Sequence, residues 1–213
     1  MFLSVFDLDK TLLKKNSSVE FCKFLYKKNI ISLVQVLFSL FYYIRHCCFG
    51  LSLEQLHNKS FKKILFGFSL PFLQEQVESF LEKELSNLLY LPALNALYLA
   101  KQSGHSTYIL SSSPQFLVCA IAQKLQVHNS KSSEYLVDKH GRLCQIAIVL
   151  DGEGKSAFLE QFREKNAIAK ENVTAYSDSY LDLPFLLSAG SVVVVNPDSR
   201  LKRLSKKLGW RQI

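Results

Sequence analysis

The stretch that decides the fold is FLSVFDLDKT, residues 2–11. Residues 2–6 form a short apolar run, the pattern of a strand buried on both faces of a sheet. Two carboxylates, Asp7 and Asp9, follow that strand at once. Taken alone, an Asp-x-Asp pair is most often a polar turn, so its meaning depends on what the rest of the chain places beside it.

The rest of the chain divides into a helical part and an alternating part. Residues 17–91 show helical periodicity, with breaks near Asn29, at 50–52 and at 67–71. After Pro92, predicted helices alternate with strands, which an α/β fold with a parallel sheet between layers of helices explains. The expected elements are helix 93–102, strand 107–110, a helix opened by Pro114, hairpin 135–149, helix 155–165, strand 173–176, helix 181–188, strand 191–195 and a basic helix ending near Gly209.

Polar residues gather where these strands end. Ligands of parallel sheets bind beyond the carboxyl ends of the strands, so these residues are expected to converge on one crevice. Several carboxylates in one place repel each other unless a cation joins them, and oxygen ligands suit magnesium better than zinc. We expect Ser113 to act as the N-cap of the helix at Pro114. The other residues of the set are Asp7, Asp9, Thr11, Ser111, Ser112, Lys155, Asp178 and Asp182.

In the order and spacing of these residues, the chain resembles the haloacid dehalogenase-like (HAD) phosphatase superfamily, in the branch similar to phosphoserine phosphatases. The similarity runs over the whole length and extends to the tail around 195–198 and Gly209-Trp210. The resemblance implies a Rossmann-like parallel sheet flanked by helices, with an inserted helical cap domain. The catalytic core would comprise residues 1–14 and 92–213, and the cap residues 15–91. The implied activity is Mg²⁺-dependent hydrolysis of a small phosphorylated metabolite.

The resemblance also implies a role for each matching residue. Asp7 would be the nucleophile and carry an aspartyl-phosphate intermediate. Asp9 would be the general acid toward the leaving oxygen and then the general base for water. Thr11 would steady the loop, while Ser111 and the backbone N–H of Ser112 would bind phosphate oxygens. Lys155 would neutralise the transferring group, and Mg²⁺ would be held by Asp7, the backbone carbonyl of Asp9, Asp178 and, directly or through water, Asp182.

The cap departs from phosphoserine phosphatases where these bind their substrate. Those enzymes carry a glutamate early in the cap for the substrate amine, and at the matching distance from Asp7 this chain has Asn16. The nearest carboxylate, Glu20, comes a helical turn later. Arg45 is the only arginine before Pro92, so the expected partner of the substrate carboxylate has no clear counterpart. These departures count against phosphoserine as the substrate.

Residues 30–44 are almost continuously apolar, too short a run for a membrane-spanning helix. We expect a buried helix that packs two cap helices together, with membrane contact as the alternative. The region also resembles bacterial phosphatidylglycerophosphate phosphatases, as does 176–184, so a membrane-associated lipid phosphate phosphatase is the alternative function. The alternative draws on the basic residues around the run, which are Lys14, Lys15, Lys23, Lys27, Lys28, Lys59, Lys62 and Lys63.

Net charge, cysteine content and the absence of certain motifs narrow the remaining classes of function. The net charge of +8 favours anionic partners, but no zinc-finger, basic-zipper or RNA-binding motif indicates specific nucleic-acid binding. Five irregularly spaced cysteines indicate reduced, mostly buried thiols. With no signal-peptide pattern, we expect a cytoplasmic protein, or one peripheral to the inner membrane face. A non-catalytic phosphate-binding protein is a third interpretation, and the substrate, oligomeric state and choice between phosphatase and phosphotransferase stay open.

Overall fold

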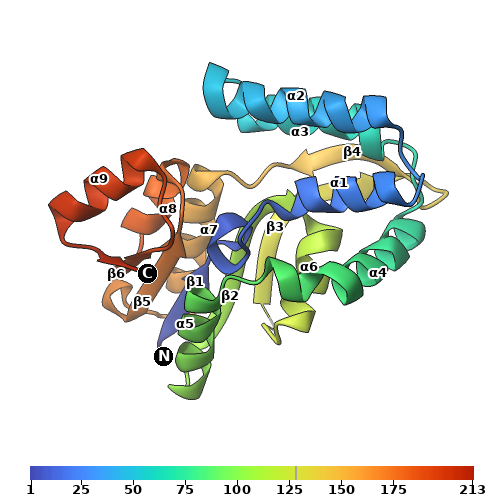
Figure 1. Ribbon diagram of the computed structural model, residues 1–213. Helices are drawn as coiled ribbons and strands as arrows, with labels where there is room; N and C mark the ends of the chain where they lie inside the picture. The colour runs from blue at the N-terminus through green and yellow to red at the C-terminus, as the bar shows by residue number, and fades with distance from the viewer. Residues whose placement is uncertain (128) are drawn as a thin grey trace.

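A computed structural model describes residues 1–127 and 129–213, without the side chains of residues 46–48. The described chain forms a seven-stranded sheet in the order β4-β3-β2-β1-β5-β6-β7 (Figure 1). Neighbouring strands are parallel except for the pair β3–β4. The strands are β1 (Leu3–Phe6), β2 (Ser106–Pro114), β3 (Asn129–Val137), β4 (Leu143–Ile148), β5 (Val173–Ser177), β6 (Ser191–Val194) and β7 (Arg211–Gln212).

Helices cover both faces of this sheet because its central strand is apolar on both sides. Leu3 and Val5 of β1 face a cluster with α7 (Gly152–Lys165), α8 (Leu183–Leu187) and α9 (Ser199–Leu208). Phe6 faces the opposite cluster, which includes α5 (Leu91–Gln102) and α6 (Gln115–Lys124). The prediction of a parallel α/β sheet is confirmed, and β1 lies at its centre, as its burial requires.

The structure adds strands that the sequence pattern does not indicate. Strand β3 begins at Asn129, because its first half pairs with β2 in parallel and only its second half pairs with β4 in the expected hairpin. Residues 129–134 are mostly Ser, Asn, Lys and Glu, which have low strand propensity, so sheet pairing outweighs local preference. The short strand β7 likewise exists only through its pairing with β6.

The segment 15–91 is helical, as predicted. Its elements are α1 (Ser17–Lys27), α2 (Leu33–Phe49), α3 (Leu53–Ser60), the π-helical turn η2 (Phe61–Leu65) and α4 (Leu70–Leu88). Phe21, Phe24 and Phe80 stack against one another and, with α6, extend the hydrophobic cluster of Phe6. The helical segment and one face of the sheet layer therefore share a continuous core.

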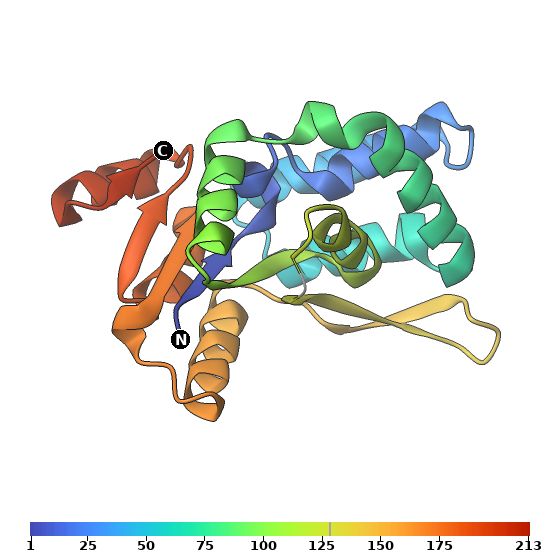
Figure 2. The same ribbon diagram turned by 90° about the horizontal axis from the view of Figure 1, so that it is seen from below.

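The β3–β4 hairpin joins the helical segment to the sheet. It extends beyond the sheet and passes beneath α2 and α3 (Figures 1 and 2). Backbone bonds link its tip to the turn before α4: Gly67 N donates to Leu143 O at 2.8 Å, and Leu143 N donates to Phe68 O at 2.9 Å. His57 of α3 contacts the Tyr135 hydroxyl at 2.8 Å. These contacts fix the position of α3 relative to the sheet.

Helix α2 is less buried than its apolar sequence predicts. A capping box of Ser32 and Gln35 begins the helix, and Gly50, with φ of 69°, ends it. We expected its apolar run to be buried, but one side of the helix is exposed, because only its opposite side rests on α1, α3 and η2. No helix in the described part of the chain is long and apolar enough to cross a membrane.

The thiols also differ from expectation. Cys22 is partly buried, whereas Cys119 and Cys144 are exposed, because both lie on outward faces of α6 and β4. The side chains of Cys47 and Cys48 lie outside the described residues. The prediction of mostly buried thiols is therefore wrong for the cysteines that can be compared, and all three of these are free thiols.

Candidate active site

The loop after β1 positions Asp7 and Asp9. The Asp7 backbone N–H donates to Tyr176 O of β5 at 2.9 Å, which fixes the strand end. The chain then reverses in the turn η1 (Leu8–Leu12), closed by Leu13 N donating to Leu8 O at 3.0 Å. Lys10 has φ of 62° in this turn, a left-handed conformation that costs free energy in a non-glycine residue. Strain of this kind is common where a loop must hold functional groups in place.

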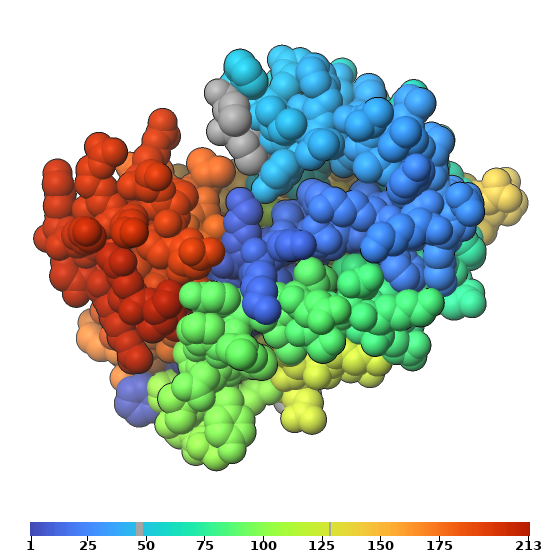
Figure 3. Space-filling view, in the orientation of Figure 1, coloured from blue at the N-terminus to red at the C-terminus, as the bar shows by residue number. Residues whose placement is uncertain are grey.

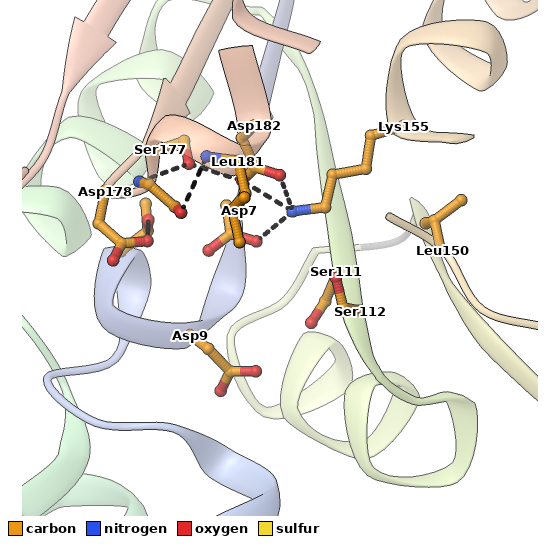
Figure 4. A network of polar contacts seen from close by, with 12 residues as sticks. Asp7, Asp9, Ser111, Ser112, Leu150, Lys155, Ser177, Asp178, Leu181 and Asp182 are labelled. Carbon is orange, nitrogen blue, oxygen red and sulfur yellow. Dashed lines mark hydrogen bonds and ion pairs between the residues drawn. The ribbon is translucent and has the colours of Figure 1, made fainter. Parts of the chain in front are cut away.

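Lys155 is the centre of a buried ionic network. Its Nζ donates to Asp7 Oδ1 at 2.6 Å and to both carboxylate oxygens of Asp182 at 2.9 Å. The Lys155 side chain is 2% exposed and each carboxylate side chain 8%. Ser177 Oγ donates to Asp182 Oδ2 at 2.6 Å. Figure 4 shows the Lys155 ammonium between Asp7 and Asp182. A buried charge is tolerated only when it is paired in this way.

Gly152 places Lys155 at that point. Lys155 is the fourth residue of α7, whose N-cap Asp151 accepts a hydrogen bond from Gly154 N at 2.9 Å. The first turn of α7 packs directly on the backbone at Leu181. A Cβ on Gly152 would lie 2.1 Å from Leu181 O, closer than any side chain allows. The absence of a side chain thus lets α7 approach the turn that carries Asp182.

Asp178 takes part in none of the ion pairs found among the described residues, although the charges of Lys10 and Lys155 act on it. It is 8% exposed, and Thr11 Oγ1 donates to its Oδ1 at 3.4 Å. Burial, with repulsion from Asp7 and Asp182, raises the pKa of Asp178 to about 8. Burial likewise raises the pKa of Asp7 to about 7, although Lys155 opposes the rise. Burial lowers the pKa of Lys155, but Asp182 and Asp7 outweigh that effect and hold it above its ordinary value.

These carboxylates fit a magnesium ion. Two buried acids with raised pKa values form a place where a divalent cation would relieve both repulsion and desolvation. No group of three or more His, Cys, Asp or Glu side chains in metal-binding arrangement occurs among the described residues. Magnesium commonly takes one or two carboxylates and keeps several waters, so Asp7 and Asp178 suit it without a third side chain. Asp182 is occupied by Lys155 and Ser177.

Asp9 stands apart from this network, as Figure 4 shows. Its Oδ1 accepts a hydrogen bond from Ser17 N at 2.5 Å, and its Oδ2 accepts one from Ser113 Oγ at 2.6 Å. Ser113 therefore does not cap α6 as predicted; the N-cap is Pro114, which has no side-chain donor or acceptor. The physical reason is that the Ser113 hydroxyl is directed to the Asp9 carboxyl and not to the first turn of α6.

Ser111 and Ser112 lie at a bulge in β2. The register with β3 shifts between Ser111 and Pro114, which releases residues 112 and 113 from the ladder. Ser111 Oγ is buried and accepts a hydrogen bond from Ser113 N at 3.1 Å. Ser133 Oγ donates to Ser112 O at 2.6 Å and so fixes the bulge. Figure 4 shows both serines beside Asp7 and Lys155.

The structure thus brings together Asp7, Thr11, Lys155, Asp178 and Asp182, with Ser111 and Ser112 adjacent and Asp9 on the same loop. Sequence reasoning missed three supporting hydroxyl and amide groups, those of Ser177, Ser17 and Ser113. Ser177 had a usable signal, since it immediately precedes Asp178 at the end of β5. The contacts of Asp9 with residues 17 and 113 depend on tertiary packing and have no local signal.

Comparison with known proteins identifies the family of the chain. The family model for haloacid dehalogenase-like hydrolases matches residues 4–187. The chain belongs to this family. A probable phosphatase of Mycobacterium tuberculosis is 26% identical over 207 residues, 96% of this chain and 72% of that protein. A phosphoserine phosphatase from the same species is 26% identical over 211 residues, covering 96% and 68%. A histidinol-phosphatase of Neisseria meningitidis is 24% identical over 218 residues, covering 98% and 96%.

Solved structures share the fold over almost the whole chain. A protein of unknown function from Bordetella pertussis superposes with a TM-score of 0.88 at 22% identity, covering 99% of this chain and 97% of that one. A phosphoserine phosphatase with an analogue of its phospho-aspartyl intermediate gives 0.71 at 18% identity, covering 95% and 90%. The predicted superfamily and branch, the fold and the enzyme class are confirmed.

Proposed function

We propose that this HAD hydrolase is a Mg²⁺-dependent phosphomonoesterase that works through an aspartyl phosphate on Asp7. The observation that carries the proposal is the buried contact of Asp7 with Lys155, 2.6 Å apart, beside a second buried acid, Asp178. Burial raises the pKa of Asp7, and the positive charges of Lys155 and of a bound cation would act against that rise and favour the ionised carboxylate that attacks phosphorus. The same positive charges would offset the negative charge of the phosphoryl oxygens.

The residues divide the reaction into two displacements. A carboxylate oxygen of Asp7 forms a bond to phosphorus as the bond from phosphorus to the ester oxygen breaks, and Asp9 gives that oxygen its proton. Asp9 then takes a proton from water, whose oxygen bonds to phosphorus as the bond to Asp7 breaks, releasing phosphate. The hydrogen bonds from Ser17 N and Ser113 Oγ hold the Asp9 carboxyl in one orientation through both steps.

The remaining residues would bind the magnesium ion and the phosphoryl group. Asp7 and Asp178 would hold the magnesium, with the backbone carbonyl of Asp9 as the third protein ligand. When bound, the ion supplies positive charge that polarises the phosphoryl group. Asp182 orients Lys155 and would meet the ion through water, because its oxygens already accept from Lys155 and Ser177. Ser111 Oγ and Ser112 N–H would bind the phosphoryl oxygens.

For the substrate, we propose a small phosphorylated metabolite, selected by residues 15–91 acting as a cap. Asn16 is the N-cap of α1 and accepts a hydrogen bond from Val19 N at 3.0 Å. Glu20 is paired with Lys23 at 2.7 Å. Neither position therefore offers an unpaired carboxylate for a substrate amine, which argues against phosphoserine. Relatives of similar identity bear the names of phosphoserine and histidinol phosphatases, so similarity does not select the ester.

The test is phosphate release from a panel of esters, measured with magnesium and with chelator. The panel contains phosphoserine, histidinol phosphate, sugar phosphates, nucleotides and phosphatidylglycerophosphate in detergent. We expect magnesium-dependent release from at least one ester, with phosphoserine among the poor substrates. Release that continues unchanged in chelator, or that is best with phosphoserine, would contradict the corresponding part of the proposal.

A further inference from the structure

Helix α2 presents its apolar side to solvent. Val34 is 66% exposed and Phe41 54%, and both belong to a row of exposed apolar residues. At 100° per residue these positions cover an arc of about 120° on one side of the helix, wide enough for a continuous stripe. We call this stripe the outer face; its residues are Leu33, Val34, Leu37, Leu40, Phe41 and Ile44. Figure 3 shows nothing packed over α2 at the top of the molecule.

The polar residues of α2 point the other way. Gln35 Nε2 donates to Lys63 O at 2.9 Å, which ties the inner side of the helix to η2. Ser39, Tyr42 and Tyr43 are partly buried on that inner side. A surface helix normally turns its polar side to water, so α2 has the reverse orientation. A contiguous exposed apolar stripe of this kind marks an interaction surface.

The outer face is bordered by positive charge. The Arg45 guanidinium lies 5.9 Å from the centre of the Phe41 ring, and Lys63 Nζ lies 5.5 Å from that of Phe38. Lys59 and Lys62 are exposed on the adjoining α3 and η2. No ion pair between described residues involves Arg45, Lys59, Lys62 or Lys63. Between residues 21 and 74 the sequence has a single acid, Glu54.

We propose that the outer face of α2 binds the surface of an anionic lipid bilayer. Apolar residues bordered by arginine and lysine match an interfacial helix, which inserts its apolar side between headgroups and holds anionic lipid with its basic residues. A second copy of the chain fits less well. An isologous contact through this face would bring the same basic border into opposition with itself, at an electrostatic cost.

The side of α2 opposite the outer face lies near the loop of Asp7. Lys10 Nζ, in that loop, is 6.0 Å from the centre of the Tyr43 ring on the inner side of α2. A bilayer on the outer face would therefore be separated from that loop by the width of α2, about 10–12 Å, which would keep the enzyme near phosphate groups at the bilayer surface. That consequence rests on the proposed function; the binding itself does not.

The experiment is flotation of the purified full chain with two kinds of vesicle, phosphatidylcholine alone and phosphatidylcholine with phosphatidylglycerol. We expect binding to the anionic vesicles only. The double variant Leu37→Gln/Phe41→Gln should bind at least about tenfold more weakly. Lys62→Gln/Lys63→Gln should lose about fivefold per charge removed. Magnesium-dependent release from a soluble ester should be unchanged in all of these proteins, which separates failure of binding from failure of catalysis.

Matched controls lie on the far helices. Leu99→Gln/Leu208→Gln removes two exposed leucines of α5 and α9, and Lys206→Gln/Lys207→Gln removes two exposed lysines of α9. Both should float like the unaltered protein. Failure of the unaltered protein to float, or equal flotation of the α2 variants, would overturn the proposal. A dimer by sedimentation that Leu37→Gln/Phe41→Gln converts to monomer, without vesicle binding, would identify a second copy as the occupant instead.

Discussion

The Lys155 network and the outer face of α2 depart in opposite ways from the usual arrangement, in which apolar residues are buried and charged residues are exposed. The network buries an ammonium and carboxylates, groups that are almost never buried unless paired. The outer face exposes leucine, valine and phenylalanine in a continuous row. Both arrangements cost folding free energy, and we interpret each as serving a function. The difference is where compensation comes from: the network is compensated within the chain, whereas the outer face needs a partner.

That difference has measurable consequences. Removing a partner inside the network should leave a buried charge uncompensated and cost both activity and stability. Altering the outer face should leave stability and soluble-ester activity intact and change only association. The predictions below use matched substitutions to break or sharpen this contrast.

The largest effect is expected for Asp7→Asn. An amide cannot form the acyl phosphate, so the rate should fall by at least about 10³-fold. Initial rates on the best ester of the panel measure it, with Glu171→Gln, an exposed acid on the turn before β5, as the control. Circular dichroism should show both variants folded. A folded Asp7→Asn protein that retains more than a tenth of the activity would remove Asp7 from its assigned role.

The next largest effect is expected for the loss of a buried lysine, compared with the loss of an exposed one. Lys155→Met leaves Asp7 and Asp182 without their cation and should lower the free energy of unfolding by about 3–5 kcal/mol. Lys124→Met breaks the exposed pair with Glu78 and should cause no measurable change. Urea unfolding in chelator measures both. Equal losses would show that burial does not set the strength of these pairs.

Magnesium should stabilise the protein through the same carboxylates. At a hundredfold excess over its dissociation constant, the ion should add about 2.7 kcal/mol to the free energy of unfolding. Asp178→Asn should abolish the gain, while Glu171→Gln should keep it. Thermal unfolding with and without magnesium measures this independently of turnover. A full gain in Asp178→Asn would place the ion elsewhere.

A smaller loss of stability is expected from a single methyl group on α7. Gly152→Ala sets a Cβ against Leu181 O and should cost about 1–3 kcal/mol. Gly154→Ala meets two side-chain atoms and no backbone, Leu150 Cδ1 at 3.2 Å and Asp151 Oδ1 at 3.4 Å, so higher helix propensity should make it neutral or slightly stabilising. Denaturant midpoints compare the two. If the variants are equally stable, the close approach of α7 to residue 181 is not what positions Lys155.

The smallest change is expected on the outer face. Leu37→Ala should alter the free energy of unfolding by less than about 0.5 kcal/mol, because the side chain is 54% exposed. The matched Leu73→Ala empties a fully buried position in α4 and should cost about 2–5 kcal/mol. Chemical denaturation separates them. A large loss in Leu37→Ala would mean that the outer face packs within the chain.

The sequence predicted the sheet, and the gathering of these residues at its strand ends, because the relevant signals are local. An apolar strand followed at once by Asp7, or by Asp178, locates a strand end without knowledge of the fold. The first half of β3 and the short β7 were missed because pairing with neighbouring strands, and not residue preference, creates them.

The support of the site and the exposure of α2 were beyond sequence reasoning for the same reason. Ser113 has the residue type and spacing of an N-cap, and only the fold brings the Asp9 carboxylate within 2.6 Å of it. An apolar run such as 30–44 predicts a helix with an apolar side, but not which side the neighbouring helices cover. Which direction α2 faces follows from its packing on α1, α3 and η2.

The most direct test of the central claim is to trap the covalent intermediate. The enzyme is mixed with its best ester and magnesium, quenched in acid within milliseconds, digested and examined by mass spectrometry. The account predicts a phosphoryl group on the peptide that contains Asp7, absent in chelator and in Asp7→Asn. A phosphoryl group on another residue would contradict it. Phosphate release without accumulation of a phosphorylated peptide in Asp9→Asn, a variant that slows hydrolysis of the intermediate, would contradict it as well.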